Sequence, residues 1–252
     1  MSEFEYSHDK HTLGTDWKSR VRDKEDLKIT AYHEAGHTLV NYYTEHALPL
    51  HKVTIVSKGL SGGHTAFLPE KDMMHETKAQ MLAQMDVSMG GRAAEEIAFG
   101  NDKITGGASG DLQGATNIAE YMVKKLGMSE KFGLRVVPES QQFGQQTELS
   151  QNTQEAMDSE INRLLTEAHK RASVLLKAHR KELDLLADAL LNYETLDADD
   201  VKAIVEGNSK KVAQKLASNS VLNMNNMRKP QVNKRRTGTT NEDNSSTGDV
   251  LV

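Results

Sequence analysis

The stretch His33-Glu34-Ala35-Gly36-His37 constrains this chain more than any other, because it places two histidines four residues apart in a segment that reads as helix. Residues four apart lie one above the other on an α-helix, so both imidazoles point to the same side and can bind one metal ion. Apolar residues flank the motif and predict that the helix packs against a core: Ile29, Tyr32, Leu39, Val40 and Tyr43. We therefore expect a metal centre on a buried face of a helix running from about residue 29 to residue 45.

Zinc is the ion that suits a pair of imidazoles. The chain has no cysteine, so any zinc has to be held by His, Asp or Glu. Zinc is a Lewis acid that lowers the pKa of a bound water to about 7. Glu34 lies beside the first histidine, where it can take up a proton from that water without being a ligand itself. The motif thus predicts metal-assisted hydrolysis of a peptide bond, with Glu34 as the general base.

A catalytic zinc needs a third protein ligand, and several carboxylates are candidates. Asp111 stands between a glycine-rich stretch at residues 105–110 and a predicted helix, a position where Asp also commonly serves as an N-cap. Glu95 and Glu96, on a predicted helix from about residue 76 to residue 99, compete for the role. The residue pattern by itself leaves this choice open.

The remaining patterns predict a mainly helical domain with one small β-hairpin. Two β-rich runs, residues 51–56 and 63–68, flank a glycine-rich turn. The edge of the second run can hold an extended substrate by main-chain hydrogen bonds, and its candidate residues are Gly63, His64, Thr65, Ala66 and Phe67. Helical periodicity covers residues 76–99, 112–126 and 151–193, and an acidic helix start follows at residues 195–200. The pair Gly90-Gly91 predicts either close helix packing or a break.

A rival catalytic pattern occurs in the turn, where Gly59-Leu60-Ser61-Gly62-Gly63 fits the G-x-S-x-G sequence of serine hydrolases. That nucleophile elbow requires a helix directly after the serine, whereas a strand is expected here. We therefore reject the serine-hydrolase interpretation.

The charge and hydropathy of the chain argue against some classes of binding partner. Residues 1–206 carry a net charge of −10 and residues 207–252 carry +5. An acidic body argues against nucleic acid as the main partner, so the basic residues of the tail are expected to be solvated. No apolar run approaches the roughly 20 residues that cross a bilayer, so this fragment is expected to be soluble. The polar composition beyond residue 207 predicts a disordered tail.

Five stretches, in the same order, resemble the peptidase domain of FtsH-type AAA proteases. They are residues 29–37, 85–96, 105–112, 125–129 and 193–198. Within that family the sequences of these stretches are most similar to those of the mitochondrial i-AAA protease. The similarity covers about residues 4–207. The resemblance implies a mainly α-helical, zincin-like peptidase domain with a small β-hairpin. It also implies one zinc ion per chain bound by His33, His37 and Asp111, rather than by Glu95 or Glu96, with Glu34 as base.

The resemblance further implies the organisation and partners of the protein. Residues 1–28 would link to an ATPase lid, residues 29–207 would form the peptidase domain, and residues 208–252 would be the tail. The chain contains no G-x-x-x-x-G-K-[ST] phosphate loop, so ATP would act only through an ATPase domain absent from this chain. The implied assembly is a homo-hexamer that degrades unfolded or membrane-extracted polypeptides. It would lie at the mitochondrial inner membrane, on the intermembrane-space side, with membrane contact only through segments absent here.

A rival hypothesis is a non-catalytic hexameric scaffold that keeps the fold. An intact Glu34 argues against a scaffold, because a scaffold has no need of the base.

Overall fold

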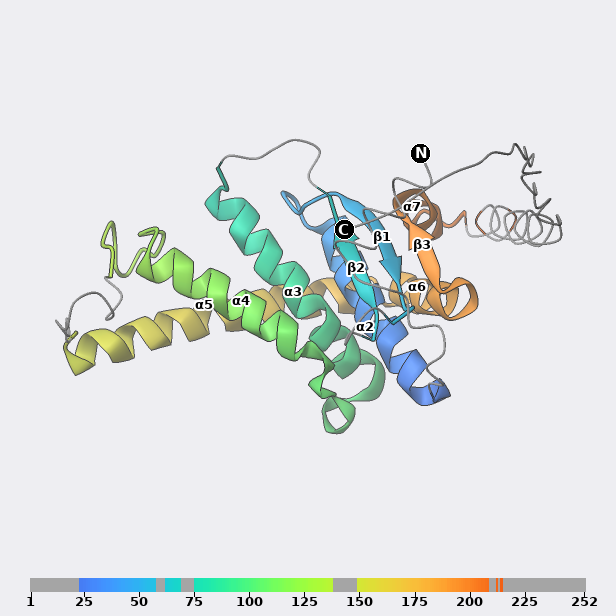
Figure 1. The fold of residues 1–252 in the computed structure, drawn as a ribbon, viewed down its shortest axis with the longest axis horizontal. Coiled ribbons are helices and arrows are strands. Elements are labelled where there is room, and N and C mark those ends of the chain that lie inside the picture. Colours follow the sequence, from blue (N-terminus) through green and yellow to red (C-terminus); the bar gives the residue numbers. More distant parts are fainter. Residues whose placement is uncertain are drawn as a thin grey trace, which may run out of the picture. The chain divides into compact units, whose positions relative to one another are not determined.

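The computed structural model describes residues 23–57, 62–68, 75–137 and 149–208, together with residues 212 and 214. It confirms a mainly helical fold with one small sheet (Figure 1). Most of the predicted disordered tail and most of the predicted N-terminal linker lie outside the described residues. The elements in chain order are α2 (Lys24–Tyr43), β1 (Leu50–Thr54), β2 (His64–Phe67), α3 (Lys78–Phe99), η1 (Asn101–Lys103), η2 (Gly106–Ala108), α4 (Ser109–Lys124), α5 (Gln151–Ala178), α6 (Arg180–Tyr193), β3 (Thr195–Asp197) and α7 (Ala198–Val205).

Helix α2 carries the histidine motif and begins five residues before the predicted start at residue 29. Its N-cap is Asp23, whose side chain accepts a hydrogen bond from the backbone N–H of Lys24 at 2.7 Å. Glu25 and Asp26 then place negative charge in the first turn, where the helix dipole favours it. Residues 24–28, expected in the linker, are therefore the first five residues of the same helix.

The core lies where α2 meets α3, α5 and α6. The second half of α2 is almost entirely buried, and Ala31, Ala35 and Leu39 have no exposed surface. Helices α3, α5 and α6 contribute large side chains that are also fully buried: Met85, Leu176, Leu183, Leu186 and Leu190. Each such side chain contributes about 1.5–3 kcal/mol by leaving water, so the histidine helix is held rigidly. Among the described residues, no helix has the length and apolar character to cross a membrane.

Glycines bring α2 and α3 into close contact. A side chain on Gly36 would overlap the carbonyl oxygen of Gly90, and one on Gly90 would lie 2.8 Å from the carbonyl oxygen of Gly36. Helix α3 continues without interruption through Gly90 and Gly91. The packing role predicted for the glycine pair is therefore confirmed, and no break occurs.

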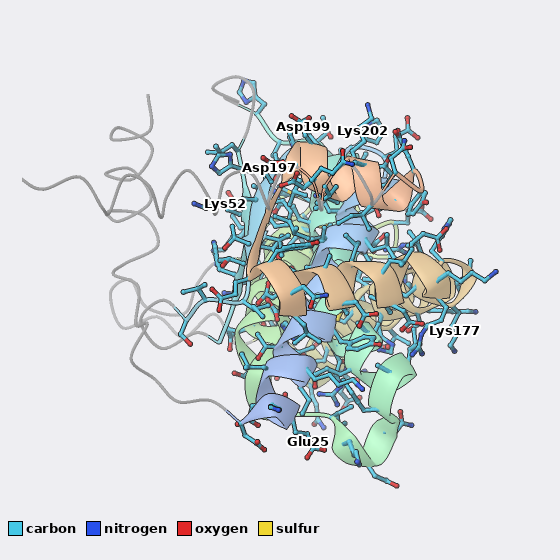
Figure 2. All side chains as sticks on the ribbon, turned by 90° about the vertical axis from the view of Figure 1, so that its right-hand side faces the viewer. Glu25, Lys52, Lys177, Asp197, Asp199 and Lys202 are labelled. Atoms are coloured by element: carbon cyan, nitrogen blue, oxygen red, sulfur yellow. The ribbon has the colours of Figure 1, made fainter. Side chains whose placement is uncertain are left out.

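The sheet has three strands in the order β2-β1-β3, with both pairings antiparallel. The predicted hairpin is confirmed, because His64 pairs with Thr54 and Thr65 with Val53. The third strand differs from the prediction, which began a helix at residue 195. The helix begins instead at Ala198, after a capping box formed by Asp197 and Asp200. Lys52 and Asp197, which are register partners on β1 and β3, lie on the same part of the surface (Figure 2).

Candidate metal centre

Three predicted ligands meet at the point where α4 begins beside α2. The Nε2 atoms of His33 and His37 lie 3.0 Å apart, and the Oδ2 atom of Asp111 lies 3.1 Å from the first and 3.3 Å from the second. Donor atoms each about 2.0–2.2 Å from one tetrahedral zinc are themselves separated by about 3.3–3.6 Å, so the three atoms here lie at or slightly inside that spacing. The imidazole and carboxylate set therefore fits zinc in both chemistry and spacing. Within the described residues it is the only group of its kind.

Helix α3 fixes the orientation of both imidazoles. The Nδ1–H of His37 donates to the carbonyl oxygen of Val87 at 2.7 Å, and the Nδ1–H of His33 donates to Glu95 Oε1 at 2.7 Å. A proton on Nδ1 leaves Nε2 as the atom that can bind a metal. Both Nε2 atoms thus face Asp111. The Val87 contact could not be predicted from residue types, because the acceptor is a backbone oxygen.

Glu95 and Glu96, the competing ligand candidates, lie outside the cluster. Glu95 is fully buried behind His33, and its second oxygen accepts a hydrogen bond from the backbone N–H of Thr105 at 2.8 Å. It therefore connects the histidine to the glycine-rich loop that precedes Asp111. Glu96 accepts a hydrogen bond from Arg92 at 3.0 Å and lies 3.0 Å from His169.

The electrostatics of the site favour positive charge. Burial lowers the pKa of His33, but hydrogen bonds to Asp111 and Glu95 outweigh it and raise the pKa to about 10. Burial raises the pKa of Asp111, and the two histidines more than reverse this and hold it well below its usual range. Zinc requires a neutral imidazole, so metal binding displaces the proton on His33 and weakens as the pH falls.

Glu34 and strand β2 share one cavity with the three ligands. The cavity has a volume of about 520 Å³, and of the predicted substrate strand, Gly63, His64, Thr65 and Phe67 line it while Ala66 does not. Glu34 is only 6% exposed, and its Oε2 accepts a hydrogen bond from Thr65 Oγ1 at 2.7 Å. Glu34, the candidate base, therefore lies in the same cavity as the three predicted metal ligands and is hydrogen-bonded to the edge strand β2.

Replacing Glu95 by Gln should weaken zinc binding about 10- to 100-fold, because this acceptor orients His33 and makes it a stronger ligand. Titration against a chelator of known affinity measures the change. The control is Glu96→Gln on the same helix, which should bind zinc as the unmodified chain does. Equal affinities for all three proteins would contradict the role assigned to Glu95.

Replacing Gly91 by Ala should remove zinc binding and destabilise the fold. A Cβ there would lie 2.6 Å from Nε2 of both His33 and His37, so the rings have to move. Such overpacking costs about 1–3 kcal/mol. The matched control is Gly114→Ala on α4, where a Cβ meets nothing within 4 Å and the helix should gain up to about 1 kcal/mol. Zinc content and urea unfolding measure both effects, and a Gly91→Ala chain that binds zinc normally would contradict the prediction.

The chain is similar in sequence to several known proteins and matches the profile of one protein family. The profile of peptidase family M41 matches residues 20–204. The chain is 54% identical over 205 residues to the "ATP-dependent zinc metalloprotease YME1L" of Drosophila melanogaster, covering 81% of this chain and 28% of that protein. It is 49% identical over 207 residues to human "ATP-dependent zinc metalloprotease YME1L1", covering 82% and 26%. The Arabidopsis thaliana "ATP-dependent zinc metalloprotease FTSH 11, chloroplastic/mitochondrial" is 44% identical over 203 residues, covering 81% and 24%.

The chain thus spans about a quarter of the length of these relatives. The family profile, in contrast, covers most of the chain and includes the whole of the metal centre. The chain belongs to peptidase family M41.

Proposed function

We propose that the chain is a zinc-dependent endopeptidase domain, the proteolytic part of an ATP-dependent AAA protease. One observation carries the proposal: His33, His37 and Asp111 each offer a ligand atom within 4.8 Å of the others, in the same cavity as the buried carboxylate of Glu34. Family membership and the names of the relatives support it.

His33, His37 and Asp111 would hold the ion. When bound, zinc supplies a Lewis acid that polarises the scissile carbonyl and lowers the pKa of water to about 7. Glu34 accepts a proton from the attacking water and returns it to the leaving amine, so the proton count balances over one turnover. Strand β2 lies at the edge of the sheet and holds the substrate in extended form by main-chain hydrogen bonds. A cavity with an edge strand along one side can bind an unfolded segment of substrate, which can pair with that strand, more readily than a folded protein.

The wider setting is also part of the proposal. The relatives are named as ATP-dependent, which supports an ATPase domain in the same full-length protein. We propose residues 1–28 as its link to that domain, with residues 24–28 already forming the start of helix α2, residues 29–207 as the peptidase and residues 208–252 as a tail. The assembly is a homo-hexamer that degrades unfolded or membrane-extracted proteins. We propose the mitochondrial inner membrane as its location, with the peptidase on the intermembrane-space side. The name of the Arabidopsis thaliana relative, which includes "mitochondrial", supports the organelle.

Metal removal tests the proposed activity. The substrate is a short, quenched fluorescent peptide, which needs no unfolding and therefore no motor. Cleavage should cease when zinc is removed by a chelator, and about one equivalent of zinc per chain should restore it. Cleavage that persists in the metal-free chain would contradict the zinc mechanism. A chain that binds zinc but cleaves nothing would support the scaffold hypothesis instead.

A further inference from the structure

The carboxylate of Glu34 is buried beneath strand β2. Glu34 is 6% exposed and Thr65 is 8% exposed, and the Thr65 hydroxyl donates to Glu34 Oε2 at 2.7 Å. A buried carboxylate is costly unless hydrogen-bond donors reach it, so this short bond stabilises the ionised side chain in place. The strand expected to hold substrate therefore also contacts the base.

Gly63 brings the backbone against the same side chain. A Cβ built at Gly63 would lie 2.8 Å from Glu34 Cγ and 2.8 Å from Oε1. It would also lie 2.9 Å from the carbonyl oxygen of Thr54 on β1. The chain at this position thus fits closely between β1 and the glutamate. The backbone of Gly63 and the hydroxyl of Thr65 both limit the positions that the Glu34 side chain can take.

We propose that Thr65 is a positioning residue for the base, with its hydroxyl fixing the orientation of the Glu34 carboxylate in the cavity shared with the three metal ligands. The inference rests on the proposed peptidase function. A glutamate side chain has three torsions, and holding it in one arrangement raises the fraction of molecules ready for proton transfer. An ionised carboxylate offers about four lone-pair sites, so a bond from Thr65 leaves sites for the proton of water.

The hydroxyl is not needed to form the strand. The pairing of β2 with β1 is made by the backbone, with Thr65 opposite Val53. Valine has the shape of threonine and a high preference for strands, so Thr65→Val removes the donor and leaves the strand intact. Serine restores the donor without the methyl group. Comparing these two variants separates the effect of the Thr65 hydroxyl from any effect on the structure of strand β2.

The kinetic test compares Thr65→Val and Thr65→Ser with the unmodified chain, using the short fluorescent peptide. For Thr65→Val, kcat should fall about tenfold or more, as expected for one lost hydrogen bond to a charged group, while KM stays unchanged. Zinc content should equal that of the unmodified chain. Thr65→Ser should recover most of kcat. The matched control is Thr54→Val on β1, another buried threonine, whose hydroxyl donates to the carbonyl oxygen of Glu194 at 3.0 Å and should not affect kcat.

A stability cycle tests the bond without using activity. Thr65→Val should lower resistance to urea in the unmodified chain, because it leaves a buried carboxylate without this donor, and should have little such effect in a Glu34→Ala chain. An unchanged kcat in Thr65→Val, a rise in KM alone, or no recovery in Thr65→Ser would each overturn the proposal. Cleavage that survives Glu34→Gln would instead overturn the peptidase mechanism itself, so the two failures are distinguishable.

Discussion

Replacing Glu34 by Gln should lower kcat for peptide cleavage by roughly 10²- to 10⁴-fold, the usual contribution of a general base. Glutamine has nearly the same size and shape and keeps an oxygen that can accept the hydrogen bond from Thr65, but it cannot take up a proton at neutral pH. Zinc per chain and stability to urea should therefore match the unmodified chain. The measurement is kcat for the fluorescent peptide beside zinc content of the same sample.

Glu96→Gln is the matched control for this experiment. Like Glu34, Glu96 is a helical glutamate whose side chain accepts a hydrogen bond, here from Arg92. Glu96 does not line the cavity, so replacing it should leave kcat unchanged. Normal cleavage by the Glu34→Gln chain would show that another group is the base. Loss of zinc together with activity would also contradict the assignment, because Glu34 is placed beside the metal and not among its ligands.

The histidine pair could be predicted from the sequence because its geometry is local. Spacing of four residues on one helix places both imidazoles on one side, whatever the rest of the chain does. The third ligand is a different problem. Asp111 and His33 are 78 residues apart, and only the folded chain brings them to 3.1 Å. Residue type alone left Asp111, Glu95 and Glu96 as possible third ligands, and only the family resemblance favoured Asp111.

Glu95 illustrates why the choice was ambiguous. It is close to His33 and makes a hydrogen bond to it, but from the Nδ1 side of the ring, opposite the shared Nε2 cluster. A carboxylate that supports a ligand and one that is a ligand look alike in a sequence. The Val87 carbonyl, which holds the other imidazole, leaves no sign in the sequence because any residue supplies a backbone oxygen.

Two boundaries differ from prediction for identifiable reasons. The N-cap Asp23 precedes Glu25 and Asp26, a helix-start pattern that the polarity of the whole segment concealed. Strand β3 is only three residues long, and its only buried residue is Leu196. A strand this short exists only because β1 offers it an edge, and the paired residues Thr54 and Thr195 are 141 positions apart in the chain. Local propensity therefore favoured the helix that follows it.

Replacing Asp111 by Ala should remove most of the zinc that the unmodified chain retains after exhaustive dialysis, which we expect to be about one ion per chain. Two histidines from one helix would remain, and two ligands without the third bind zinc far more weakly. Asp111 also lies in the first turn of α4, where its charge stabilises the helix by only about 0.3–1 kcal/mol. Loss of zinc should therefore occur in a folded chain, as circular dichroism can establish.

The control for this variant is Asp102→Ala, which removes an exposed aspartate from the neighbouring 3₁₀ turn and should leave zinc content unchanged. Zinc retained by a folded Asp111→Ala chain would transfer the third-ligand role to Glu95 or Glu96. Glu95 is the closer of these, since its carboxylate already lies 2.7 Å from His33, so a Glu95→Ala chain would then be the one to lose the metal. A Glu95→Ala chain that keeps zinc while Asp111→Ala loses it fits the arrangement proposed here, in which one carboxylate binds the ion and the other orients the histidine.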